Sequence, residues 1–170
     1  MVTNPEHMFT NARLAVAVHI LTFVAMRGQA NQSITSAMIA ASVDTNPVVI
    51  RRILGTLRQA NLVVSQPGTG GGWMLAQPAN TITLWQIYRA VQDAPLLAVH
   101  RHPPSSRCSI GQNMVGVLNI YFAQVETVVE KQLEGVTIDQ ITRAIQSRVQ
   151  MPVSPRRSTV KQSASARRTG

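Results

Sequence analysis

Residues 45–75 read TNPVVIRRILGTLRQANLVVSQPGTGGGWML, a stretch with three arginines and a glycine-rich segment between two apolar runs. Asn46 and Pro47 predict a helix start, because an asparagine side chain accepts hydrogen bonds from the first exposed amides and proline suits the first helical position. We expect this helix to end near Ala60. Its apolar spacing predicts a buried stripe, made of Val49, Ile50, Ile53, Leu54 and Leu57. The outward side is expected to carry Val48, Arg51, Arg52, Gly55, Arg58 and Gln59.

A shorter helix is predicted just before it. Residues 35–43 read TSAMIAASV, in which Thr35 is a typical helix cap. Asp44 and Thr45 are expected to end this helix. Two short helices a few residues apart, the second basic and exposed, form a helix-turn-helix. Ile34 is expected to form a short strand in front of the pair.

A β-hairpin is predicted after the basic helix. Residues 62–66 (LVVSQ) and 73–76 (WMLA) are rich in strand formers, and the PGTGGG between them supplies the positive φ angles that a hairpin loop needs. We interpret this hairpin as the wing of a winged helix-turn-helix. Its glycines also allow the backbone to approach phosphates without side-chain collision.

Packing helices are predicted on both sides of this unit. Residues 11–26 are apolar on nearly all sides, which predicts a central helix capped by Thr10 or Asn11, with His19 as a core histidine. A helix capped by Thr83 is expected to extend to residue 92. The fold class is therefore mainly α with a small β-hairpin.

The C-terminal part is predicted to hold a long dimerisation helix. Residues 113–134 carry an apolar stripe wider than one contact needs, which favours a second copy of the chain as partner. A short helix should follow from Thr137. The predicted division is a DNA-binding domain at 10–92, a sensor-type loop at 93–112, dimer elements at 113–147 and a disordered basic tail at 148–170. The expected dimer contacts are Met114, Val117, Leu118, Tyr121, Val125 and Val128.

The charge balance points to nucleic acid as the partner. Sixteen lysines and arginines stand against seven acidic residues, a net charge of +9, and fourteen of the sixteen are arginine. Arginine offers a planar fork that matches phosphates and guanine edges. Residues 11–92 carry six arginines and one acidic residue, so the basic character is not confined to the tail.

The exposed arginines of the second helix are expected to enter the major groove of duplex DNA. Arg51 is the first choice for reading a base and Arg52 for a phosphate, while Arg58 fits either DNA or the helix dipole. The full set of expected DNA contacts is Thr45, Asn46, Pro47, Val48, Arg51, Arg52, Arg58, Gly68, Thr69, Gly70 and Gly71.

The quoted motifs resemble a known family. TNARLAVAVHIL, IAASVDTNPVVIRRILGTLRQANLV, SQPGTGGGWMLA and ITLWQIYRAV are similar, in fixed order, to the Rrf-two family of winged helix-turn-helix regulators, which includes IscR, NsrR and CymR, and to its YwnA-like branch. The match covers about residues 10–147. The resemblance implies a homodimeric, DNA-binding transcriptional repressor with residues 113–134 as its dimer element.

The sequence departs from this family at two places. Members that sense through an iron–sulphur cluster hold it on three cysteines in the loop before the dimer helix, whereas Cys108 is the single cysteine here, so no cluster or other cofactor is expected. Many relatives also carry an arginine near the wing tip, where this chain has Thr69. Wing contacts are then weaker or made by backbone amides.

Cys108 remains a sensor candidate. Arg101 and Arg107 nearby would lower the pKa of its thiol and raise the thiolate fraction. A metal site with His100 and His102 is the weaker functional interpretation. Cys108 without any function is the remaining alternative. A small-molecule or redox effector is compatible with the pattern. A single cysteine excludes an intrachain disulfide, and residues 14–26 are too short to span a membrane, so a soluble, cytoplasmic protein is expected.

Two other functions compete with that of a regulator. The basic tail alone would produce a non-specific nucleic-acid-binding accessory protein. A small metal enzyme built on the histidines and Cys108 lacks paired carboxylates, a catalytic triad and a complete metal motif, so no catalytic residue and no metal ligand is predicted.

Overall fold

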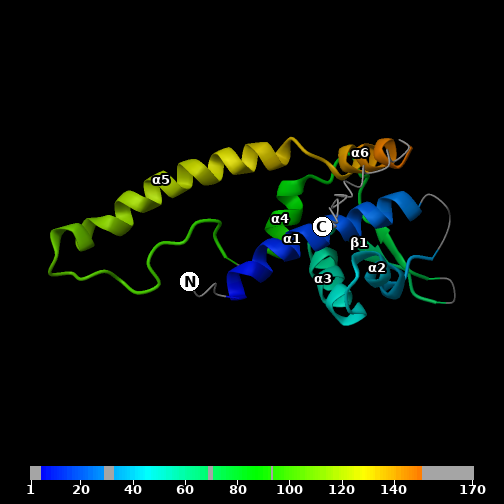
Figure 1. The fold of residues 1–170 in the computed structure, drawn as a ribbon, viewed down its shortest axis with the longest axis horizontal. Coiled ribbons are helices and arrows are strands. Elements are labelled where there is room, and N and C mark those ends of the chain that lie inside the picture. Colours follow the sequence, from blue (N-terminus) through cyan, green and yellow to red (C-terminus); the bar gives the residue numbers. More distant parts are fainter. Residues whose placement is uncertain (1–4, 29–32, 69–70, 93, 151–170) are drawn as a thin grey trace, which may run out of the picture.

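The computed structural model describes residues 5–28, 33–68, 71–92 and 94–150. Six helices and one two-stranded antiparallel hairpin make up this part of the chain (Figure 1). The predictions made for Thr69, Gly70 and residues 151–170 lie outside it. In chain order the elements are α1 (Pro5–Arg27), α2 (Ser36–Val43), α3 (Pro47–Gln59), β1 (Val63–Ser65), β2 (Trp73–Leu75), α4 (Leu84–Val91), α5 (Ser109–Glu134) and α6 (Ile138–Gln150).

Helix α1 is the centre of the body. It packs against α2, α3, α4, α6 and β2, and its inner face is fully buried. The predicted start of this helix was wrong, because α1 begins at Pro5 and Thr10 and Asn11 lie inside it. Proline is well suited to a first helical turn, and no breaker separates it from the apolar run. His19 is exposed rather than a core residue, and its Nε2 lies 2.9 Å from Ser42 Oγ.

The core is aliphatic. It combines residues from α1, α2, α3, α4, α6 and β1 with Ile34, Leu62 and Ile82 from the connecting segments. The largest fully buried side chains are Ile20, Leu21, Ile34, Ile39, Ile50, Leu54, Leu57, Leu62, Ile82, Ile87, Ile138 and Val24. Such β-branched and γ-branched aliphatic side chains pack helices closely without aromatic residues. Within the described residues, no helix combines the length and apolar character needed to cross a membrane.

The helix-turn-helix forms where the sequence predicts it. Thr35 Oγ1 accepts from the Met38 amide at 3.2 Å and caps α2, and Asp44 ends that helix in the left-handed region at φ 57°. Asn46 Oδ1 accepts from the Val48 amide at 2.8 Å and caps α3. Helix α3 then runs almost to the expected end at Ala60.

One member of the predicted stripe of α3 is misplaced. Ile50, Ile53, Leu54 and Leu57 are buried, but Val49 is 45% exposed. Each residue of an α-helix turns the side chain by about 100°, so Val49 lies about a quarter turn away from the axis of the other four. It belongs to the outward surface.

The wing also forms as predicted, with a difference at Ile34. Strands β1 and β2 pair antiparallel in the register Val63↔Leu75 and Ser65↔Trp73. Ile34 is not a strand, although its carbonyl accepts from the Trp73 amide at 2.9 Å. A Cβ on Gly72 would lie 2.6 Å from the Ile34 nitrogen, so only glycine permits this close approach.

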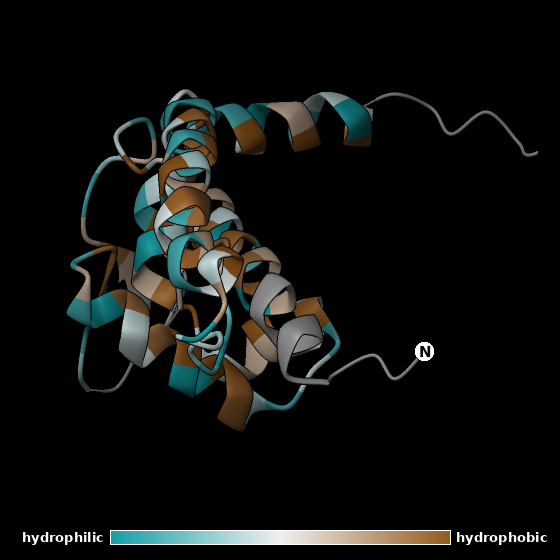
Figure 2. Ribbon diagram, turned by 90° about the vertical axis from the view of Figure 1, so that its left-hand side faces the viewer, coloured by the Kyte–Doolittle hydropathy of each residue, from teal (hydrophilic) through white to brown (hydrophobic). Residues whose placement is uncertain are grey.

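The C-terminal elements differ from the prediction at their ends. Helix α5 begins at Ser109 instead of 113, so the loop before it is shorter and Cys108 becomes its cap residue. Helix α6 extends to Gln150, so residues 148–150, which were assigned to the tail, are helical. Figure 1 shows α5 projecting from the body, with only its C-terminal part near α4 and α6. Hydrophobic residues recur along α6, and the C-terminal end of this helix extends beyond the other helices (Figure 2).

The predicted fold class is confirmed. The chain is mainly helical with one small hairpin, and it has the arrangement of a winged helix-turn-helix followed by a long helix.

Candidate nucleic-acid interface

Helix α3 presents a basic surface to solvent. Arg51, Arg52 and Arg58 are all exposed. Within the described part of the chain none of these three side chains has an ion pair or hydrogen bond, whereas Arg143 on α6 forms a salt bridge with Asp139. Three guanidinium groups are thus available to an external anion.

Two valines lie beside the arginines. Val48 is 61% exposed and Val49 is 45% exposed. Exposed methyl groups next to arginines are suited to the apolar contacts that a major groove offers at thymine. Sequence reasoning chose Val48 and missed Val49, because the apolar periodicity assigned Val49 to the core. Helical geometry places Val48 about half a turn and Val49 about a quarter turn from the axis of the buried stripe, so the offset of Val49 was the available signal.

The start of α3 is fixed by its own cap. Asn46 is exposed, while Thr45 and Pro47 are half-buried, and the Asn46 side chain is already engaged with the Val48 amide. Pro47 has no amide hydrogen, and the Thr45, Val48 and Val49 amides donate to the Ala40 carbonyl, Asn46 Oδ1 and the Asn46 carbonyl. These residues therefore fix the start of α3 and do not offer a set of free backbone donors to a phosphate.

The wing is joined rigidly to the end of α3. Asn61 adopts a left-handed conformation at φ 55°, and the Leu62 amide donates to the Leu57 carbonyl at 2.9 Å. Gln77 Nε2 donates to the Asn61 carbonyl at 2.9 Å, which attaches the chain after β2 to the same corner. Figure 1 shows α3 and the hairpin on the same side of the body, opposite α6. A binding partner that contacts the arginines of α3 is therefore also close to the wing.

The described wing glycines have different roles. Gly68 has φ +103°, a conformation that favours glycine, at the first bend of the loop. The Gly71 amide donates to the Gly68 carbonyl at 2.9 Å, and the Gly71 carbonyl accepts from Ser33 Oγ. A Cβ on Gly71 would collide with the Gln66 carbonyl. Gly71 therefore closes the turn, and its amide is not free to donate to a phosphate.

Cys108 lies at the start of α5 and is exposed. The backbone amides of Gly111 and then Ile110 stabilise its thiolate and lower the pKa of the thiol. The cause is therefore the helix N-terminus, and not Arg101 and Arg107 as predicted. Among the described residues, no group of three or more His, Cys, Asp or Glu side chains is arranged to hold a metal ion.

The dimer candidates occupy a helix with no buried residue. Val117, Tyr121, Val125 and Val128 are 47%, 60%, 46% and 61% exposed, and Met114 and Leu118 are half-buried. Ile110 on the same stripe is 66% exposed and was not among the predicted contacts. Its omission follows from the late start assigned to the helix.

Most of the chain matches a known protein family. The family model Rrf2, described as an iron-dependent transcriptional regulator, matches residues 10–144. This chain belongs to the Rrf2 (Rrf-two) family. The family is one of helix-turn-helix transcriptional regulators and not of enzymes, so the Rrf2 chain is a DNA-binding regulator and the resemblance seen in the sequence is confirmed.

Relatives of this Rrf2 chain support the assignment. The HTH-type transcriptional regulator YwnA of Bacillus subtilis is 36% identical over 132 residues, which cover 77% of this chain and 95% of YwnA. The crystal structure of a DNA-binding protein superimposes with a TM-score of 0.61 at 32% identity, covering 76% of this chain and 97% of the other. The structure of IscR from T. potens shares the fold, with a TM-score of 0.60 at 20% identity and coverage of 84% and 90%.

Proposed function

We propose that this Rrf2 regulator is a repressor that binds a palindromic operator as a homodimer, without an iron–sulphur cluster. The observation that carries the proposal is the outward face of α3, where Arg51 and Arg52 have no partner among the described residues and the wing is fixed beside them. A basic helix of this kind fits the major groove while a hairpin rests on the adjacent backbone.

The arginines have separate proposed roles. Arg51 reads a guanine edge, and a bidentate contact of this type contributes about 1–3 kcal/mol of discrimination against other bases. Arg52 binds a phosphate, which positions the helix without reading sequence. Val48 and Val49 contact apolar groups in the groove, and Arg58 binds a phosphate near the end of α3.

The wing is proposed to touch the sugar–phosphate backbone. Gly68, with the loop residues Thr69 and Gly70, forms its tip in the sequence. Gly71 is left out of the proposed phosphate contacts, because its amide is bonded inside the turn.

The homodimer is proposed to form through α5. The exposed apolar stripe of that helix is suited to the same stripe of a second copy, which would remove several valines and Tyr121 from water. A two-fold dimer presents two α3 helices, so it selects half-sites about 34–36 Å or a multiple of that distance apart.

The absence of a cluster is proposed from the donor set. The family description names iron, yet the chain has one cysteine where cluster-bearing members have three. Cys108 is exposed, and no group of three or more potential ligands gathers anywhere in residues 5–28, 33–68, 71–92 and 94–150. The residues present do not fit a cysteine-ligated cluster.

Repression is the simplest outcome of such binding. The described part of the chain has one DNA-binding unit and one projecting helix, so a bound dimer acts most directly by covering its operator. Its site of action is then the compartment that holds the DNA, which we take to be the cytoplasm.

The basic tail supports a second candidate. Residues 151–170 carry five basic and no acidic residues, which favours sequence-independent attraction to nucleic acid. Selection of bound duplexes from random DNA, by the full chain and by a variant that ends at Gln150, separates the two functions. Both proteins should enrich the same palindrome. Loss of all enrichment in the shortened chain would favour the accessory protein.

A further inference from the structure

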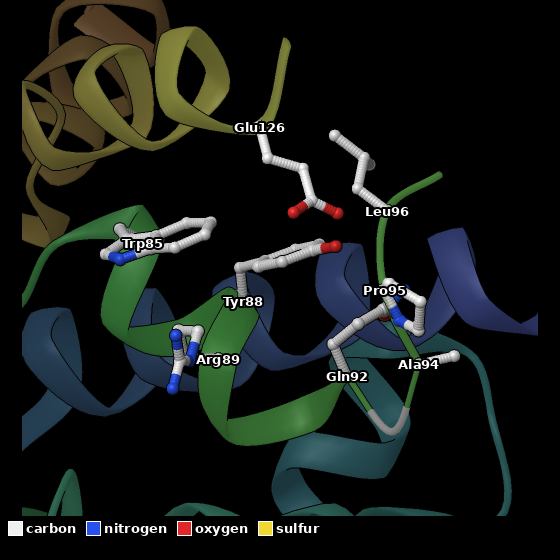
Figure 3. Close-up of a pocket in the computed structure, with 8 residues that line it drawn as sticks. All are labelled: Trp85, Tyr88, Arg89, Gln92, Ala94, Pro95, Leu96 and Glu126. Carbon is white, nitrogen blue, oxygen red and sulfur yellow. The ribbon is translucent and has the colours of Figure 1, made fainter. Parts of the chain in front are cut away.

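A cavity of about 300 Å³ lies between α4, the segment after it and the C-terminal half of α5 (Figure 3). Helix α4 supplies Trp85 and Tyr88, and Pro95 and Leu96 close one side. Glu126 of α5 reaches in from above in the view of Figure 3. The volume is at the lower end of the range for pockets that bind small molecules.

Two polar groups in this cavity lack partners. Tyr88 is 9% exposed and its hydroxyl oxygen is buried; the Gln92 side chain lies near this oxygen but is not in hydrogen-bonding geometry with it. The Glu126 carboxylate has no ion pair in that part of the chain, and it points toward Tyr88 in Figure 3. Burial, followed by the charge of Glu126, raises the pKa of Tyr88 by more than the Gln92 side chain lowers it, so its hydroxyl stays protonated. Buried polar groups are nearly always paired, so the Tyr88 hydroxyl, with the half-buried Glu126 carboxylate beside it, points to a ligand of this cavity.

The aromatic rings determine the sign of the charge that fits. Trp85 and Tyr88 stack with centroids 5.2 Å apart and an interplanar angle of 11°. Their faces attract cations, and the Glu126 carboxylate adds negative charge above them. Arg89 lies 5.9 Å from the Trp85 ring and projects away from Glu126 in Figure 3, so its charge is on the other side of the ring.

We propose that this cavity binds a small organic cation, a protonated amine with a short apolar or aromatic body. The ammonium group donates to the Glu126 carboxylate and to the Tyr88 hydroxyl oxygen. The apolar body lies on the Trp85 and Tyr88 rings and against Leu96.

A second copy of the chain would leave this cavity open. Glu126 lies on nearly the opposite side of α5 from Tyr121 and Val128, since each helical residue turns the side chain by about 100°. The dimer stripe and the cavity therefore use different faces of the same helix.

The position of the cavity also suggests what the ligand controls. Helix α4 packs against α3 on one side and α5 on the other. A bound amine would fix the spacing of α4 and α5, and thereby the placement of α3 in a dimer. This regulatory step rests on the proposed function, whereas binding of the amine does not.

Calorimetric titration of the full-length protein with phenethylamine tests the site directly. We expect saturable binding that Glu126→Gln weakens at least about tenfold, because a charge-assisted hydrogen bond is lost. Glu134→Gln removes the same charge at the exposed end of α5 and should leave the affinity within about twofold. Should Glu126→Gln fail to fold by circular dichroism, Tyr88→Phe replaces it and is expected to weaken binding as well.

Three results would overturn the proposal. One is the absence of binding at millimolar phenethylamine. Another is equal affinity in wild type, Glu126→Gln and Tyr88→Phe. The third is equally tight binding of 3-phenylpropionate, which has the same ring but a carboxylate in place of the ammonium.

Operator binding in saturating phenethylamine separates the site from the proposed function. We expect a changed affinity for the selected duplex, measured by fluorescence anisotropy. An unchanged affinity would overturn the regulatory step and leave the calorimetric site intact. A protein that binds the amine but selects no duplex would contradict the proposed function alone.

Discussion

Thr83 and Thr137 pair in an isolated antiparallel bridge, and each residue also caps the helix that follows it. Thr83 Oγ1 accepts from the Gln86 amide at 3.2 Å, and Thr137 Oγ1 accepts from the Gln140 amide at 3.4 Å. Both glutamine side chains reach back to the threonine amides, so two capping boxes begin at one joint. The bridge therefore holds the starts of α4 and α6 together.

Removing a cap at this joint should destabilise the protein. Thr83→Ala is expected to lower the free energy of unfolding by about 1 kcal/mol, because the Gln86 amide loses its acceptor. Urea denaturation followed by circular dichroism measures the change. Thr127→Ala on exposed α5 is the control, since its hydroxyl only donates to the Ala123 carbonyl, and it should change stability by less than about 0.5 kcal/mol. Equal stability of Thr83→Ala and wild type would exclude a capping role.

Substitution of Arg51 and substitution of Arg52 should affect DNA binding in different ways. Arg51→Ala is expected to lose discrimination of about 1–3 kcal/mol at particular base pairs, because a base edge loses its bidentate donor. Arg52→Ala should weaken binding to all DNA sequences alike. It should also lower the slope of log binding constant against log salt concentration by about one. Competition binding with single-base variants of the selected operator, at several salt concentrations, distinguishes these outcomes.

Arg148→Ala is the matched control for both substitutions. Arg148 is exposed on α6, on the other side of the body from α3, so the same charge is removed outside the proposed interface. Its effect should be small and independent of sequence. Uniform losses for Arg51→Ala and Arg52→Ala would contradict the assignment of base reading to Arg51.

A single charged substitution on the apolar stripe of α5 tests whether the chain dimerises through this helix. Val125 is 46% exposed on the apolar stripe, and Val125→Asp should give a monomer, because the carboxylate would be buried against a second copy. Sedimentation equilibrium measures the mass. Asn119→Asp adds the same charge on the opposite side of α5 and should leave the dimer intact. A wild-type monomer at the concentrations used for DNA binding would exclude the palindromic mode.

The helix-turn-helix could be predicted because its signals are local. Thr35, Asn46 and Pro47 act within one turn of their own position, and the structure has these caps where the sequence indicates them. Exposure was harder to predict, as Val49 shows, because an apolar residue a quarter turn from the stripe has the same chemistry as a buried one.

Tertiary relationships were beyond the reach of the pattern. Tyr88 and Glu126 are far apart in the sequence, and nothing around either residue indicates that they meet in one cavity. The position of Cys108 depended on where α5 begins, and Pro103 and Pro104 obscured that start. The sequence therefore attributed a lower pKa of the Cys108 thiol to two neighbouring arginines, whereas the amides at the start of α5 lower it.

The thiol of Cys108 should react at lower pH in the folded protein than in the unfolded chain. Its pKa is lowered by the Gly111 and Ile110 amides, so the thiolate fraction at neutral pH rises on folding. The rate of alkylation by iodoacetamide, measured from pH 6 to about 10, should reach its midpoint at lower pH in buffer than in concentrated urea. Urea removes the helix but keeps Arg101 and Arg107 next to the cysteine in sequence, so it also separates the two causes. Coincident midpoints would show that the start of α5 has no influence on this thiol.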